Sequence, residues 1–202
     1  EFDFFTTTES SRLLAAAPAD DYLMLLTALR TGMRRGELRG IQWDDVDLVA
    51  KRIRVKRSIL DDGHETTPKN HRVRDIPISP ELLAALKSHR HLKGDLVFCN
   101  NDGSVLTRFQ MRSIVPRACK RAGLRRIQWH ALRHSFASQL VMAGKPLKAV
   151  QELLGHSTIQ MTMCYAHLAE STLIDAVESL DSTTQDPAGF GHHVGTSEMR
   201  SP

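Results

Sequence analysis

Acidic residues are missing from one long stretch of this 202-residue chain. From Gly103 to Gln151 there is no Asp or Glu, although the whole chain carries 23 of them. The stretch is rich in Arg and Lys, and a surface of one charge sign attracts a polyanion. We therefore expect a nucleic-acid partner rather than a solvated basic face, because acids are usually interleaved where charge serves only solubility. The basic residues are Arg108, Arg112, Arg117, Lys120, Arg121, Arg125, Arg126, Arg133, Lys145 and Lys148.

Cysteine is also scarce. An odd number without close spacing, Cys99, Cys119 and Cys164, argues against a disulfide framework and against a zinc site, and it favours a reducing cytoplasm. No apolar run approaches the ~20 residues that a membrane helix needs. The N-terminus has no signal-peptide pattern, so we expect neither export nor a membrane. The chain begins at Glu1 without Met, which suggests a piece of a longer protein.

Apolar periodicity predicts a mainly helical fold with a small antiparallel β-sheet (α+β). Apolar residues recur at helical spacing from Tyr22 to Leu29, which indicates a buried helix ending near Gly32. Alternation around Ile53 and Val55 indicates a strand, and the whole of 51–78 fits one small sheet. Later helices are expected near residues 108–122, 130–143, 146–153, 158–166 and 169–180.

The expected domain ends where the sequence becomes mainly polar. Residues 1–180 are expected to form one domain. Residues 181–202 are polar and rich in Gly, so we expect a disordered tail.

The sequence contains only two tyrosines, so few side chains of this type could act as the nucleophile of a phosphodiester exchange. Of the two tyrosines, Tyr22 lies on the apolar helix stripe, whereas Tyr165 follows the basic stretch. Exchange of a phosphodiester bond without metal needs a nucleophile, cations that hold the phosphate oxygens and an acid for the leaving oxygen. A side-chain nucleophile keeps the bond energy in a covalent intermediate, so rejoining needs no ATP.

Cationic and imidazole groups precede Tyr165. His130 and Arg133 are three residues apart, so on a helix they share a face and can address one phosphate. Gly155 is expected to end a helix, which places His156 at an inter-helix corner.

These motifs resemble a known family. The run His130-Ala131-Leu132-Arg133-His134, then Leu154-Gly155-His156, then Tyr165 is similar to the C-terminal signature of the tyrosine recombinases of phage-integrase type. Residues 31–38 resemble the segment of the family's first catalytic arginine, which falls on Arg34. Residues 68–77 resemble its β-hairpin lysine element, and the lysine falls on Lys69. The matches come in family order over residues 31–167, and such a set is far more specific than one motif.

The resemblance implies a catalytic role for each residue. Tyr165 would attack the phosphorus and form a covalent 3′-phosphotyrosine. Arg34 and Arg133 would clamp the phosphate, because a guanidinium fork matches two of its oxygens. Free tyrosine has a pKa of about 10, so the cations would also favour phenolate.

Three further residues complete the implied site. Lys69 would act as general acid toward the 5′-oxygen. His130 would help to activate Tyr165 or donate to the phosphate, and His156 would hydrogen-bond a non-bridging oxygen. The resemblance implies no cofactor and no metal.

Neighbouring residues leave alternatives open. Arg35 adjoins Arg34, but on a helix it points about 100° away, so a surface or DNA-backbone role is expected. His134 lies four residues after His130 and could reach the same face, so it has either a supporting role or none. Glu37 is expected to be structural, packing on or orienting an arginine.

Three other classes of protein share part of this pattern. His130 and His134 echo a zinc-hydrolase helix, but that motif needs Glu where Ala131 stands. A DNA-binding module without catalysis conflicts with the filled catalytic positions. A type IB topoisomerase-like enzyme shares the chemistry, but the size and the integrase-like signatures favour the recombinase.

The resemblance also implies partners. Double-stranded DNA at specific recombination sites is the expected substrate, in a prokaryotic cytoplasm. Leu173, Ile174 and Val177 give the end of the chain an apolar stripe, which either docks on a neighbouring protomer, as in a tetramer on DNA, or packs on its own core. Family members usually carry a smaller helical DNA-binding domain that these residues do not include, so we expect weak, salt-dependent DNA binding.

Overall fold

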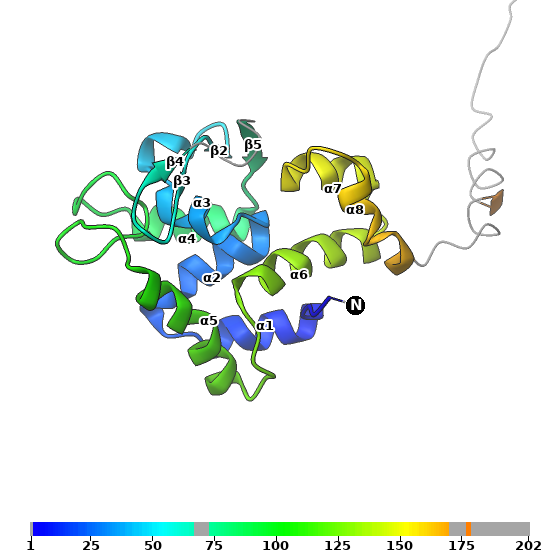
Figure 1. Ribbon diagram of the computed structural model, residues 1–202, viewed down its shortest axis with the longest axis horizontal. Coiled ribbons are helices and arrows are strands. Elements are labelled where there is room, and N and C mark those ends of the chain that lie inside the picture. Colours follow the sequence, from blue (N-terminus) through cyan, green and yellow to red (C-terminus); the bar gives the residue numbers. More distant parts are fainter. Residues whose placement is uncertain (1, 67–72, 170–176, 179–202) are drawn as a thin grey trace, which may run out of the picture. The chain divides into compact units, whose positions relative to one another are not determined.

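The computed structural model describes residues 2–66, 73–169 and 177–178. Figure 1 shows how the elements within residues 2–169 are arranged. Lys69, the expected tail over 181–202 and most of the expected helix over 169–180 lie outside the described ranges. Within the described part, no helix combines the length and the apolar character needed to cross a bilayer.

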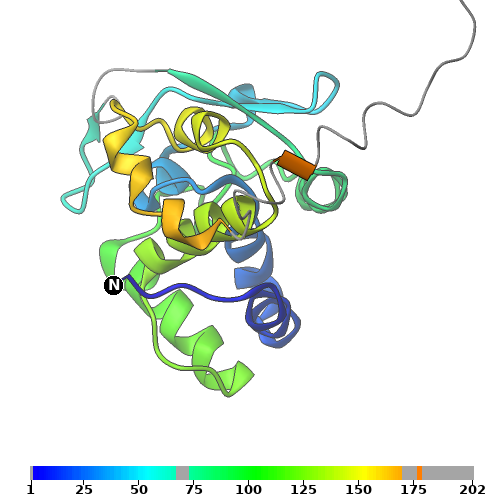
Figure 2. The same cartoon turned by 90° about the vertical axis from the view of Figure 1, so that its right-hand side faces the viewer.

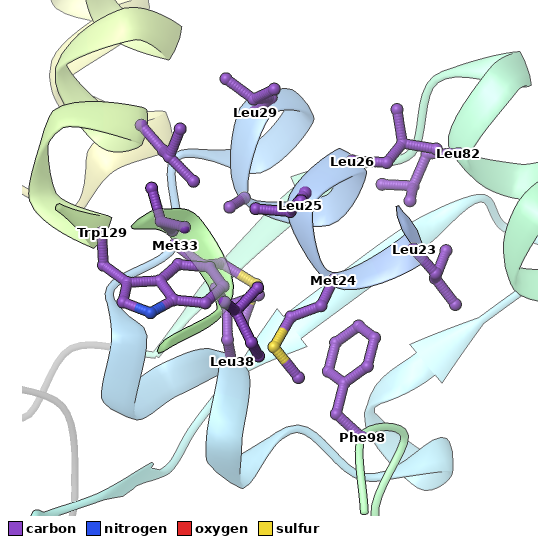
Figure 3. Close-up of a cluster of buried hydrophobic side chains, with 14 of the residues drawn as sticks. Leu23, Met24, Leu25, Leu26, Leu29, Met33, Leu38, Leu82, Phe98 and Trp129 are labelled. Carbon is purple, nitrogen blue, oxygen red and sulfur yellow. The ribbon is translucent and has the colours of Figure 1, made fainter. Parts of the chain in front are cut away.

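The first half is built on α2 (Ala19–Thr31). This helix follows α1 (Thr7–Ala16) and ends at Gly32, which has the left-handed φ of 62° that favours glycine. The predicted helix end near Gly32 is thus confirmed. Figure 3 shows leucines of α2 gathered in the main core with Leu82 of α4 (Pro80–His89) and with Phe98.

The β-structure forms two small antiparallel sheets. β1 (Val46–Asp47), β2 (Arg52–Val55) and β5 (Arg74–Pro77) pair in the order β1-β2-β5, whereas β3 (Ser58–Ile59) pairs with β4 (Glu65–Thr66). The prediction of one sheet over 51–78 is therefore wrong, because the strands of this segment belong to two separate sheets. The chain leaves the first sheet after β2 because β3 packs on α3 (Arg35–Gly40), where the glycines of that helix allow close approach.

The second half is helical. It comprises α5 (Arg108–Ala122), α6 (Trp129–Met142), α7 (Leu147–Leu154), α8 (Gln160–Met163) and a 3-10 turn over Ala166–Leu168. In Figures 1 and 2 the yellow-to-orange segment α7–α8 lies over α6, and α6 also contacts α2. The middle of α6 therefore faces the ends of two other helices.

The helix expected over 158–166 is shorter in the structure. It ends at Met163, and the Tyr165 amide then donates to the Thr162 carbonyl at 3.0 Å in a tighter turn. The reason is packing, because the turn directs the Tyr165 ring into a second core cluster with Phe136, Val150 and Leu154. This cluster places Tyr165 between α6 and α7.

A glycine substitution tests how closely α2, α6 and α7 meet. At Gly32 an added Cβ would lie 2.4 Å from Phe136 Cδ1 and 2.9 Å from Leu154 Cδ2, whereas at Gly144, which has a similar φ of 70°, nothing lies within 4 Å. Gly144→Ala should cost about 1 kcal/mol for the left-handed backbone alone. Gly32→Ala should cost roughly 1–3 kcal/mol more, because overpacking is added. Urea unfolding measures both, and equal losses would show that the three helices do not meet at Gly32.

Candidate active site

Arg133 occupies the point where three helices meet. Its side chain comes from the middle of α6 and is 3% exposed. One guanidinium nitrogen donates to the Gly32 carbonyl at 2.7 Å, and another donates to the Leu154 carbonyl at 2.7 Å. These carbonyls stand at the C-terminal ends of α2 and α7, where the helix dipole favours a cation. The predicted helix end at Gly155, which has φ of 66°, belongs to this arrangement.

The charge of Arg133 has no carboxylate partner within the described ranges. Burial, followed by the charge of Arg34, lowers the pKa of Arg133 to about 9, so the group is still charged at neutral pH. A buried cation without a counter-ion is costly, because neutral carbonyls replace its water only in part. An anion that reached Arg133 would therefore be bound strongly.

Glu37 joins two further arginines. Arg34 precedes α3 and donates to the carboxylate through its amide at 2.8 Å and its guanidinium at 3.0 Å. Arg74 of β5 donates through two nitrogens, at 3.0 and 2.7 Å. Although burial raises the pKa of Glu37, the bonds and charges of Arg74 and then Arg34 lower it below its ordinary value. Glu37 thus orients Arg34, as the sequence had suggested.

Arg74 was missed by sequence reasoning. Its Nε also donates to the Leu153 carbonyl at 2.9 Å, so the side chain links β5 to the end of α7. A signal was available, since Arg74 stands two residues before the buried Ile76 and so shares the inward face of the strand. An arginine on such a face needs an acid partner, which here is Glu37.

His156 lies at the corner after Gly155, as expected, and is 9% exposed. Its Nδ1 lies 2.9 Å from the Thr162 hydroxyl. Burial, and then the charges of Arg133 and Arg34, lower the pKa of His156 to about 4, so the ring is neutral. If Thr162 donates to Nδ1, the ring hydrogen is on Nε2 and is available to a ligand.

Tyr165 is buried and hydrogen-bonded. Its side chain is 2% exposed, and its hydroxyl lies 2.7 Å from Nδ1 of His134. Burial raises the pKa of Tyr165 to about 12, whereas Arg133 acts in the opposite direction. Arg133 thus favours phenolate, as expected, but in the free protein desolvation outweighs its charge and the pKa is raised overall.

The two histidines of the α6 motif have different positions. His130 is exposed at its ring, and burial, with the charges of Arg133 and Arg34, lowers its pKa. The rings of His130 and His134 meet edge to face with centroids 4.6 Å apart. Within the described ranges the side chain that is hydrogen-bonded to the Tyr165 hydroxyl is His134. His134 was not among the catalytic residues predicted from the sequence. Its spacing of four residues from His130, which places both on one helix face, was the signal that could have identified it.

The structure thus brings together five of the six residues singled out in sequence. Arg34 and Arg133 both act on the pKa of His130 and of His156, and Arg133 acts on that of Tyr165. Lys69 falls in the part of the chain left undescribed. Among the described His, Cys, Asp and Glu side chains, no group of three could hold a metal ion.

The basic stretch is partly neutralised by acids from elsewhere in the chain. Arg108 pairs with Asp61, Arg117 with Asp21, and Arg125 with Asp3 and Glu9. Its charge is therefore less one-sided on the surface than along the sequence. Five exposed basic residues of this stretch form no ion pair with any described side chain, namely Arg112, Lys120, Arg121, Arg126 and Lys145.

The sequence is similar to those of known proteins. Residues 3–172 match the model of the phage integrase family. The XerC-like tyrosine recombinase of Caldanaerobacter subterraneus subsp. tengcongensis is 34% identical over 188 residues, which cover 78% of this chain and 48% of that protein. The chain spans about half the length of the curated relatives it matches.

Solved structures share the fold. The catalytic domain of bacteriophage HP1 integrase is 29% identical, with a TM-score of 0.67 over 91% of this chain and 98% of that one. The XerH site-specific recombinase bound to its palindromic difH substrate, in a post-cleavage complex, is 26% identical, with a TM-score of 0.67 over 89% of this chain and 53% of that one. On the family match and the shared fold together, this chain belongs to the phage integrase family.

Proposed function

We propose that this chain is the catalytic part of a site-specific tyrosine recombinase, which cuts and rejoins DNA through a covalent 3′-phosphotyrosine at Tyr165 without metal or ATP. The observation that carries the proposal is the buried Arg133, a cation that forms no direct ion pair with a described carboxylate and whose charge acts on Tyr165. A scissile phosphate would supply the missing anion in direct reach of the nucleophile. Membership of the phage integrase family supports the same reaction.

The arginines hold the phosphate. Arg133 is fixed by two helix-end carbonyls and Arg34 by Glu37, so neither has to reorganise when the anion enters. Such preorganised charge stabilises the extra negative charge of the transition state more than it stabilises the substrate. Arg74 shares Glu37, which leaves Arg34 with positive charge for the phosphate.

The remaining groups handle protons and oxygens. His156, neutral and with Nδ1 beside the Thr162 hydroxyl, directs its Nε2 hydrogen to a non-bridging oxygen. His130, exposed beside Arg133, donates to the phosphate. Lys69 protonates the 5′-oxygen as it leaves, so that no metal is needed to stabilise that oxygen.

Double-stranded DNA at specific recombination sites is the proposed substrate. The structural neighbour XerH is a recombinase bound to its difH substrate, and the exposed unpaired basic residues of this chain suit a phosphate backbone. We also propose self-association on DNA, as a tetramer, through the apolar C-terminal residues Leu173, Ile174 and Val177.

A nicked suicide substrate tests the nucleophile. When the strand beyond the cleavage point is lost by diffusion, rejoining is prevented and a covalent protein–DNA adduct accumulates. Wild type should form the adduct equally with and without chelator, and Tyr165→Phe should form none, on denaturing gels. Tyr22→Phe is the matched control and should retain the adduct. An adduct that survives in Tyr165→Phe would refute the proposed nucleophile.

Glu37 should make stability depend on acid pH. Its pKa is lowered in the folded protein, so its contribution is present above the ordinary Glu value of 4.5 and is lost as pH falls through the folded pKa. Glu37→Gln should cost roughly 3–5 kcal/mol at pH 7, because two arginines lose a buried partner. It should also flatten the loss of stability below pH ~4.5.

Asp75→Asn provides the control for Glu37→Gln. Its ion pair with Arg54 is exposed, so the cost should be under about 1 kcal/mol. Urea unfolding between pH 3 and pH 7 measures both variants. Equal costs would show that Glu37 does not hold the arginines in the way the distances indicate.

The unpaired basic residues should set the salt dependence of DNA binding. Replacing Arg112 and Arg126 with Gln should reduce the slope of log affinity against log salt by about 0.9 for each DNA phosphate that the protein no longer neutralises. Arg54→Gln, whose charge is already paired with Asp75, should leave the slope nearly unchanged. Fluorescence anisotropy with a labelled duplex measures the slopes. An unaltered slope in the double variant would place the DNA on another face.

A further inference from the structure

His134 touches the one atom that the proposed reaction makes nucleophilic. Its Nδ1 lies 2.7 Å from the Tyr165 hydroxyl, whereas His130 contacts the ring of His134. We propose that His134 is a catalytic residue that accepts the proton of Tyr165 during strand cleavage and returns it during rejoining. This inference rests on the proposed function, because it assigns a role to a group beside its nucleophile.

The His134 ring is held so that Nδ1 faces the hydroxyl. Phe2 stacks on one face with centroids 4.6 Å apart and planes 19° apart, and His130 packs against the ring at 4.6 Å and 87°. Phe2 also meets the Tyr165 ring at 4.8 Å, edge to face. The donor–acceptor distance is that of a strong hydrogen bond, within the range that proton transfer requires.

The N-terminal segment that carries Phe2 is itself anchored to α6. The Phe5 amide donates to the Ser135 hydroxyl at 2.8 Å, and the Gln139 amide group donates to the Phe5 carbonyl at 3.0 Å. Figure 2 shows this blue segment passing beside α6. α6, which carries His134, therefore also anchors the segment of Phe2, and the Phe2 ring limits rotation of the His134 ring.

The charges around His134 suit a proton acceptor. His130 and Arg133 face it from its own helix, Tyr165 from the turn after α8, and His156 from the corner after α7. Burial, and then His130 and Arg133, lower the pKa of His134 to about 4, so the ring is neutral at pH 7. With the pKa of Tyr165 near 12, the proton stays on the phenol in the free protein. A bound phosphate would offset the cations and raise the affinity of His134 for the proton.

The proton balance is complete. The Tyr165 oxygen forms its bond to phosphorus while its proton passes to Nδ1 of His134, whose own hydrogen is on Nε2. The bond from phosphorus to the 5′-oxygen breaks, and that oxygen keeps the electron pair and takes a proton from the general acid. In rejoining, the 5′-hydroxyl attacks phosphorus and gives its proton back to the group that served as general acid. The bond from phosphorus to the Tyr165 oxygen breaks, and that oxygen recovers its proton from His134.

Single-turnover cleavage of the suicide substrate by the full chain tests the assignment. Asn in place of His134 keeps a hydrogen-bonding group near the position of Nδ1 but cannot accept a proton. His134→Asn should therefore cleave about 10²–10⁴-fold more slowly, and the fall in rate toward acid pH that reflects protonation of His134 should disappear. A group that only supported the fold would not change the pH profile in this way.

Chemical rescue separates proton transfer from packing. His134→Ala, shown by urea unfolding to be folded, should regain activity with added imidazole, and more basic imidazoles should restore more. Wild type, which already has the base, should not respond. Cleavage by His134→Asn within about threefold of wild type, or no rescue of folded His134→Ala, would overturn the assignment. Failure of the wider function would look different, because wild type itself would then form no adduct.

Discussion

The hydrogen bonding of the buried Arg133 guanidinium is the interaction on which the rest of the structure depends. Its two bonds to the Gly32 and Leu154 carbonyls join α6 to the ends of α2 and α7. Both helices end at glycines with left-handed backbones, which aim these carbonyls at the cation. The same junction supports the second core cluster, in which Tyr165 packs. Arg133 and Tyr165 are therefore positioned by one set of contacts.

The pocket has an excess of positive charge that the protein does not neutralise. Three arginines, Arg34, Arg74 and Arg133, act around a single buried carboxylate, Glu37, and the nearby His156 is neutral. Low dielectric makes this excess expensive in the free protein and favourable when an anion enters. Burial in the same environment keeps Tyr165 protonated at neutral pH in the free protein. In the proposed reaction, a DNA phosphate would be both the substrate and the anion that balances the positive charge of the site.

Features that depend on neighbouring residues could be predicted from the sequence. Contacts between residues far apart in the chain could not. The helix end at Gly32 and the corner at Gly155 follow from residues next to one another in sequence. The burial of Tyr165 does not, because it depends on packing against α6 and α7. The hydrogen bond between His134 and Tyr165 and the ion pair of Arg74 could not be predicted for the same reason, since each joins residues more than 30 positions apart.

The identity of the atom that joins protein to DNA tests the account most directly. The adduct trapped with a suicide substrate can be trimmed with nuclease, digested with protease and sequenced by mass spectrometry. The account predicts that the remaining nucleotide is attached through its 3′-phosphate to the peptide containing Tyr165, at the tyrosine itself. A nucleotide attached to Tyr22, to a serine or to a histidine, or attached through its 5′-phosphate, would contradict it.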